Sequence, residues 1–105
     1  MEIKMSIVSE KSGDGKQVTI KIEGRFDFGS HHDFRDTYRS NNDPGTSFSL
    51  DMSATEYMDS SALGMILLLK EHASTLGGEI EIVNASSDIK NILEIANFDK
   101  LFKVT

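Results

Sequence analysis

The stretch Tyr57-Met58-Asp59-Ser60-Ser61-Ala62-Leu63-Gly64 joins two apolar segments of different periodicity, and the rest of the fold can be worked out from it. Before it, apolar and polar side chains alternate over residues 47–52, which predicts a strand with one buried face. After it, the unbroken apolar run Met65–Leu69 lies in a long segment without proline, which predicts a largely buried helix. The aspartate and both serines of the stretch suit the N-cap, because their oxygens accept hydrogen bonds from first-turn N–H groups. We therefore expect two serine hydroxyls at the positive end of a helix.

The first thirty residues predict a β-hairpin followed by a loop. Apolar and polar side chains alternate over residues 3–7 and again over residues 18–22, and Ser12-Gly13-Asp14-Gly15 between them suits a turn. This pattern predicts an antiparallel hairpin with one solvated face. Residues 24–30, which contain two glycines, are expected to form a loop that ends at a helix-capping Ser30.

A first helix is predicted over about His31–Ser40. Phe34 and Tyr38 lie four residues apart in it and therefore on one face. The turn-forming segment Asn41–Gly45 then breaks the chain, so the strand over residues 47–52 starts afresh.

The central helix, from about Ser60 to Leu76, has two faces on a helical wheel. Gly64 lies on the polar side with Ser60, and Leu67 and Leu68 border that side. These two leucines are either covered by another element of the chain or exposed as a docking surface, and the pattern alone leaves both readings open. The side chains predicted to face the core are Ala62, Ile66, Leu69, Ala73 and Leu76.

The remaining pattern completes an α/β fold. Gly77-Gly78 ends the helix, residues 80–83 predict a strand, residues 86–96 a capped amphipathic helix, and residues 101–104 a short last strand. The order is β-β-α-β-α-β-α-(β), with helices as crossovers between parallel strands. We expect a mixed sheet of four to five strands, about three main helices, and a single domain over residues 1–105.

Composition narrows the range of functions. The formal net charge is −6, from 11 basic and 17 acidic residues, and the basic residues are scattered, which disfavours direct nucleic-acid binding. The absence of cysteine excludes disulfides, thiolate metal sites and a cysteine nucleophile. No apolar run approaches the roughly 20 residues of a membrane span, and the start lacks a signal-peptide pattern, so a cytoplasmic location is expected.

An enzyme or metal site is poorly supported. Ser60 beside Asp59, with three histidines elsewhere, contains the residue types of a serine hydrolase. The glycines that flank a nucleophile elbow are missing, because Met58 and Ala62 stand in their places. The adjacent pair His31-His32 would point about 100° apart in a helix and would not chelate one ion together. We therefore predict no catalytic residue, metal or cofactor.

A third interpretation treats Ser60 as a modified residue. A helix N-terminus stabilises a nearby anion, so a phosphate there would leave the fold intact while adding roughly −1.5 to −2 units of charge. The simpler alternative is that the aspartate and serines only cap the helix, worth about 1 kcal/mol. Physical reasoning alone favours the simple cap.

Three segments together resemble a known family. Met58–Gly64, with the strand before it and the apolar helix after it, resembles the signature of the STAS domain, specifically that of bacterial anti-sigma factor antagonists. Gly24-Arg25-Phe26-Asp27 is similar to the family's segment after the second strand, and Asn97–Phe102 to its closing segment. The resemblance covers nearly the whole chain and implies the STAS fold.

The resemblance also implies a partner switch. The unmodified protein would bind an anti-sigma factor, commonly a GHKL-type serine kinase, which would phosphorylate Ser60, and a PP2C-like phosphatase would reverse the reaction. Ser61 matches the second hydroxyl of the motif, which is usually not the main acceptor, and Asp27 matches an acid near the acceptor. Ala62 stands where the family most often has glycine, so partner choice can differ.

A second function remains open within the same family. STAS-like domains also serve as constitutive subunits of larger transport or signalling assemblies, in which the acceptor serine is idle. The intact Asp59-Ser60 pair favours the switch over this alternative.

Overall fold

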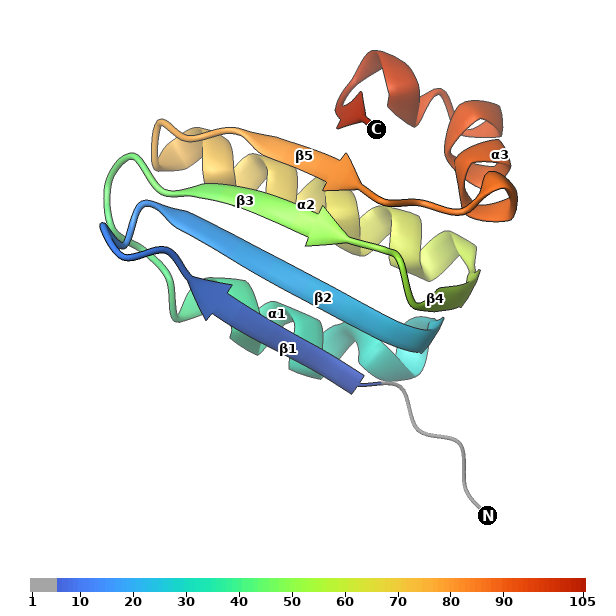
Figure 1. Cartoon of the computed structure of the whole chain (residues 1–105), viewed down its shortest axis with the longest axis horizontal. Helices are drawn as coiled ribbons and strands as arrows, with labels where there is room; N and C mark the ends of the chain where they lie inside the picture. The colour runs from blue at the N-terminus through green and yellow to red at the C-terminus, as the bar shows by residue number, and fades with distance from the viewer. Residues whose placement is uncertain (1–5) are drawn as a thin grey trace.

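A mixed sheet with helices packed on one face forms the body of the molecule (Figure 1). The computed structural model describes residues 6–105 of the chain. The six strands are β1 (Ser6–Lys11), β2 (Gln17–Phe26), β3 (Ser47–Asp51), β4 (Thr55–Met58), β5 (Ile80–Val83) and β6 (Lys103–Val104). The helices are α1 (His31–Arg39), α2 (Ser60–Thr75) and α3 (Ser87–Ile95), with short 3-10 turns η1 (Phe28–Ser30) and η2 (Phe98–Lys100).

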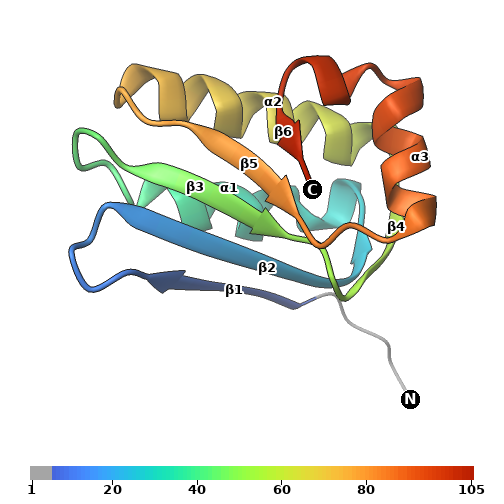
Figure 2. The ribbon, with the colours of Figure 1, turned by 45° about the horizontal axis from the view of Figure 1, so that its top comes forward.

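The sheet order is β1-β2-β3-β5-β6, and β4 pairs with the second half of β2. β1 is antiparallel to β2, and the other paired strands are parallel. Figures 1 and 2 show α1 and α2 on the same face of the sheet, while α3 lies beyond the end of β5 near β4. The predicted α/β architecture with a mixed sheet and crossover helices is confirmed, and β4 is the strand that the pattern did not predict.

The ten-residue strand β2 determines where the central stretch lies. Residues 17–21 pair with β3, and residues 24–26 pair with β4. A turn joins β3 to β4, in which the Ser53 amide donates to Asp51 Oδ1 at 3.0 Å. β4 therefore follows β2 to its carboxyl end, and the two segments that leave these strands, at Asp27 and Asp59, start side by side.

The predicted N-terminal hairpin is confirmed. β1 and β2 pair from Ser6↔Glu23 to Lys11↔Val18, and Gly15 N donates to Ser12 O at 2.9 Å in the turn. The part of this prediction that involved residues 3–5 lies outside the described residues.

The prediction of a loop over residues 24–30 is wrong in its first half. Residues 24–26 continue β2 because β4 supplies hydrogen-bonding partners there, and the register shifts next to Gly24, whose φ is +82°. The second half of the segment is the 3-10 turn η1. Ser30 does not cap α1 with its side chain; its hydroxyl instead accepts a hydrogen bond from Asp27 N at 3.1 Å.

The core lies between the sheet and the pair α1 and α2. Four of the five α2 side chains predicted to face the core are fully buried, and Leu76 is partly buried against the same cluster. Met65 is buried as well, which the wheel had not indicated. The largest fully buried side chains from the strands and from α1 are Ile20, Ile22, Phe26, Phe34, Phe48, Leu50 and Ile82.

The last third of the chain also follows the predicted pattern. Gly77, with φ +78°, ends α2, and Gly78 N donates to Ala73 O at 2.9 Å. Ser86 Oγ accepts from Ile89 N at 3.3 Å and so caps α3. None of the helices in residues 6–105 is long and apolar enough to cross a membrane.

The tight approach at Gly78 yields a first prediction. A β-carbon at this position would collide with the carbonyl group of Thr46, whose backbone cannot easily move aside because it leads into β3. We expect Gly78→Ala to lower the free energy of unfolding by about 1–3 kcal/mol, measured by urea denaturation.

Gly64→Ala is the matched control. Gly64 lies within α2 with open space around it, so the added methyl group should raise stability by up to about 1 kcal/mol. Equal effects of the two substitutions would contradict the close approach at Gly78.

Candidate functional site

Asp59 is the N-cap of α2 and the first element of the site. Its backbone is extended, with φ −103° and ψ −179°, and its Oδ1 accepts a hydrogen bond from Ala62 N at 2.9 Å. Of the three residues that suited this role by sequence, the structure therefore selects the aspartate, and Ser60 and Ser61 become the first two residues of the helix. A carboxylate at this position also interacts favourably with the positive end of α2.

The second oxygen of the Asp59 carboxylate reaches another segment. Oδ2 accepts from Phe28 N at 3.3 Å, and Asp59 N donates to Phe26 O at 3.3 Å. One side chain thus connects the start of α2 to the start of η1, which is 31 positions earlier in the chain. Loss of this carboxylate would remove the side-chain acceptor of both Ala62 N and Phe28 N.

Asp27 lies at the same end of the sheet, held by its own contacts. Its Oδ1 accepts from Gly29 N at 3.1 Å and so caps η1, and its Oδ2 lies 3.5 Å from Arg25 Nε. The Arg25 guanidinium also lies over the Tyr57 ring, 4.3 Å from its centroid. The structure therefore brings together Asp27 and Asp59, the two acids that the resemblance assigned to one site.

Ser60 and Ser61 lie in the first turn of α2. The side chain of Ser60 is exposed and that of Ser61 is half-buried. Within residues 6–105, neither hydroxyl takes part in a hydrogen bond, because Asp59 already supplies the cap. The amides of a helix's first residues also lack intrahelical acceptors. Ser60 therefore presents an unengaged hydroxyl to solvent at a positive helix end.

The three histidines have other neighbours. His31 Nδ1 lies 3.2 Å from Phe28 O, His32 Nε2 lies 3.6 Å from Asp36 Oδ2, and His72 Nε2 lies 3.2 Å from Asn41 O. In the described part of the chain, none of these rings is hydrogen-bonded to Ser60, so a serine–histidine pair is not assembled. Among residues 6–105, no three side chains of the types His, Asp and Glu gather as a metal-binding group.

The predicted docking residues of α2 lie on two different sides of the helix. Gly64 and Leu67 lie on the same side of the helix as Ser60, at four and seven residues from it. Leu68 turns toward α1, where it lines a groove with Tyr38 and Arg35. Leu67 is 42% exposed and Leu68 55% exposed, so no element within residues 6–105 covers them.

Sequence reasoning missed the exposed aromatic residues of the site. Phe28 is 66% exposed and stacks on His31 with the ring centroids 5.0 Å apart, and Tyr57 is 42% exposed. Apolar patterns predict burial for such residues, so the exposure of Phe28 and Tyr57 carried no sequence signal.

The family profile described as "Mlab, STAS domain" matches residues 9–104 of this chain. The chain belongs to the STAS domain family. A STAS-domain-containing protein of Pseudomonas aeruginosa is 45% identical to it over 101 residues, which cover 96% of this chain and 100% of that protein.

Solved structures of STAS domains share the fold. The crystal structure of an antisigma-factor antagonist STAS domain from Rhodobacter sphaeroides is 25% identical, with a TM-score of 0.61 over 79% of this chain and 92% of that one. An anti-sigma factor antagonist from Mycobacterium paratuberculosis has a TM-score of 0.78 at 15% identity, over 96% of this chain and 85% of that one. The second likeness shows the fold alone.

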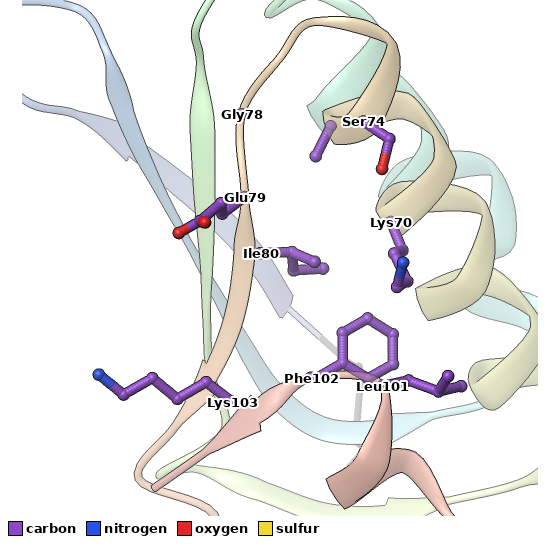
Figure 3. Close-up of a pocket in the computed structure, with 9 residues that line it drawn as sticks. Lys70, Ser74, Gly78, Glu79, Ile80, Leu101, Phe102 and Lys103 are labelled. Atoms are coloured by element: carbon purple, nitrogen blue, oxygen red, sulfur yellow. The ribbon is translucent and has the colours of Figure 1, made fainter.

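A separate hollow of about 310 Å³ lies between α2, β5 and the C-terminal segment of this STAS domain (Figure 3). Ile80 and Phe102 face each other across it, and Lys70 and Ser74 extend from α2. Glu79 points away from Ser74, to the other side of β5 (Figure 3). The hollow therefore does not place a carboxylate against its serine, and it lies away from the first turn of α2.

The double role of the Asp59 carboxylate can be measured. Asp59→Ala removes the cap and the bond to Phe28 N, so we expect a loss of about 1–2 kcal/mol in the free energy of unfolding. Asp59→Asn keeps a capping oxygen and should lose less.

Ser60→Ala and Ser61→Ala are the matched controls, because neither hydroxyl is hydrogen-bonded; both should stay within about 0.5 kcal/mol of the wild type. Urea denaturation of the four variants decides the matter. A larger loss for Ser60→Ala than for Asp59→Ala would mean that the serine is the effective cap.

Proposed function

We propose that this STAS domain is an anti-sigma factor antagonist that switches partners through phosphorylation of Ser60. The observation that carries the proposal is the division of labour at the start of α2: Asp59 caps the helix, while the Ser60 hydroxyl is exposed and unengaged. The likeness to the Rhodobacter sphaeroides antagonist at 25% identity supports the same function. A role as a regulator by binding is consistent with the partners of the three histidines, none of which is hydrogen-bonded to Ser60 among residues 6–105.

The physical chemistry of the first turn supports a phosphate there. A phosphoserine at a helix N-terminus gains from the positive end of the dipole and from amide donors that the helix leaves unpaired. The fold would therefore persist, while the surface at Ser60 would gain roughly −1.5 to −2 units of charge. Asp59 beside it adds a further negative charge, so a partner seated on this surface would be repelled.

The partners are those that the family resemblance implies. The unmodified domain would bind an anti-sigma factor that is itself a GHKL-type serine kinase, and a PP2C-like phosphatase would restore the binding form, all in the cytoplasm. Asp27 and Ser61 would border the acceptor, and the side of α2 that carries Gly64 and Leu67 would contact the kinase. The chain would act as a single domain over residues 1–105 without a cofactor.

Phosphorylation at Ser60 is tested directly with phosphate-affinity gels of the protein purified from its own bacterium. We expect two bands for the wild type, one band for Ser60→Ala, and two bands for the control Ser61→Ala. Two unchanged bands for Ser60→Ala would show that another residue accepts the phosphate. A single unmodified band for the wild type under every growth condition would favour the constitutive-subunit alternative.

The effect on partner binding is a separate prediction. Ser60→Asp places a negative charge on the exposed first turn, and we expect at least a tenfold loss of affinity for the kinase, which corresponds to about 1.4 kcal/mol. The urea midpoint should stay close to that of the wild type, because an acid is favourable at this position. Calorimetry with Ser60→Asn as the neutral control separates the effect of charge from that of size. Equal losses of affinity for both variants would contradict the electrostatic explanation.

A further inference from the structure

A groove runs between α1 and α2, and Met65 is the first α2 residue that lines it. The lining residues advance in the same direction along both helices, from His31 and Met65 to Arg39 and Thr75, so the helices run parallel. The N-termini of both helices therefore lie at the Ser60 end of the groove. Figure 2 shows the same shared direction of α1 and α2.

The first part of the groove is a small apolar pocket. It has a volume of about 70 Å³ and is lined by His31, Phe34, Arg35, Tyr38, Met65 and Leu68. One water needs roughly 10–15 Å³ and two to four polar partners, so this space is large enough for more than a water but offers few groups to hold one. An aliphatic side chain suits it better.

The second part of the groove is shallower and bears two arginines. It has a volume of about 450 Å³, with Arg35 and Arg39 on the α1 side and Glu71 on the α2 side. Arg35 and Arg39 are four residues apart and therefore lie one turn apart on the same side of α1. The positive charge of both guanidiniums acts on the Tyr38 hydroxyl between them, although burial dominates and raises the Tyr38 pKa.

Among residues 6–105, neither arginine has an acidic partner. The ion pairs within residues 6–105 are Arg25 with Asp27 and His32 with Asp36. Arg35 Nε is buried and has no hydrogen-bond partner among the described residues, while its Nη2 lies 3.4 Å from His32 Nδ1. Two unpaired cations one turn apart are notable in a chain with a net charge of −6, since acids are abundant elsewhere on it.

We propose that the α1–α2 groove binds an acidic amphipathic helix of the partner protein. An aliphatic side chain of that helix enters the apolar pocket beside Leu68, and two carboxylates one turn apart pair with Arg35 and Arg39. A helix lying along α1 presents carboxylates at i and i+4 with the spacing that the two arginines have, and helix-in-groove docking combines an apolar anchor with such flanking charges. Arginine also pairs with carboxylates in a bidentate geometry.

This inference rests on the proposed function for its link to Ser60. Met65 and Leu68 lie five and eight residues after Ser60, or about 7.5 and 12 Å along the helix axis. The first distance is close to the Debye length of about 8 Å at physiological ionic strength and the second exceeds it, so a phosphate on Ser60 would act mainly on the end of the bound helix near Met65. An acidic helix is the kind of ligand that such a phosphate repels.

The test uses a pair of synthetic helical peptides of about 16 residues, long enough to form helix in isolation. One peptide carries a leucine flanked by glutamates at i and i+4, and its twin carries lysines in place of the glutamates. Titration into the isotope-labelled full chain, followed by NMR, should shift the signals of Met65, Leu68 and Arg35. We expect the glutamate peptide to bind at least tenfold more tightly than the lysine twin.

Reversing the charge of the two arginines gives the decisive comparison. The double variant Arg35→Glu with Arg39→Glu should bind the glutamate peptide more weakly than the wild type does, and the lysine twin more tightly. The matched control, Lys90→Glu with Lys100→Glu, changes the net charge equally at exposed positions outside the groove and should bind as the wild type does. Because the Arg35 stem is half-buried, the exposed single variant Arg39→Glu repeats the test with less risk to the fold.

Several results would overturn the inference. These are equal affinities for the two peptides, signal changes outside the groove, or no preference reversal in folded arginine variants. Dimers in sedimentation that the Arg35→Glu and Arg39→Glu pair dissolves would make the groove an interface between copies of this chain instead. Ser60→Ala should bind the glutamate peptide as the wild type does, so failure of phosphorylation and failure of docking give different results.

Discussion

The hydrogen bonds of the Asp59 carboxylate are the interaction on which the site depends. One oxygen caps α2 through Ala62 N, and the other accepts from Phe28 N at the start of η1. A single charged group thus fixes two segments that leave the sheet at its carboxyl edge. Hydrogen bonds to charged acceptors are stronger than those between neutral groups, and this one is only partly shielded from water. Because Asp59 makes this connection, the Ser60 side chain is not needed to hold the two segments together.

The placement of Asp59 depends in turn on β2 having two successive partners. β3 ends at Asp51, yet the chain returns to β2 as β4 and follows it for three more paired residues. Thr55 stabilises this return, since its buried hydroxyl donates to Ile22 O at 2.8 Å. Without β4, the start of α2 would lie at the end of β3 and out of reach of the turn that follows β2.

Local patterns predicted most of the fold, and non-local contacts account for what they missed. Alternation, turn residues and caps gave the hairpin, the three helices and the short last strand, because each of these signals lies within a few residues. β4 has no such signal; Thr55–Met58 is a strand because Gly24–Phe26 lies beside it. The same reason explains the wrong loop at residues 24–26. At the site, the cluster of Asp27 and Asp59 followed from family resemblance, whereas the roles of Arg25, Phe28 and Arg35 depend on side-chain directions that periodicity cannot supply.

The separation of cap and acceptor has a consequence for how a switch of this kind can work. If Ser60 were the cap, modification would replace the group that bonds the first-turn amides, and so would alter the capping of α2 as well as its surface. With Asp59 as the cap, the added charge acts on whatever lies against the first turns of α2, and the core beneath Ala62 and Ile66 need not move. A phosphate on Ser60 would then act by charge over a distance of about a Debye length and would require no second conformation of the domain. The α1–α2 groove, whose two arginines have no acidic partner in the described part of the chain, has its near end at about that range.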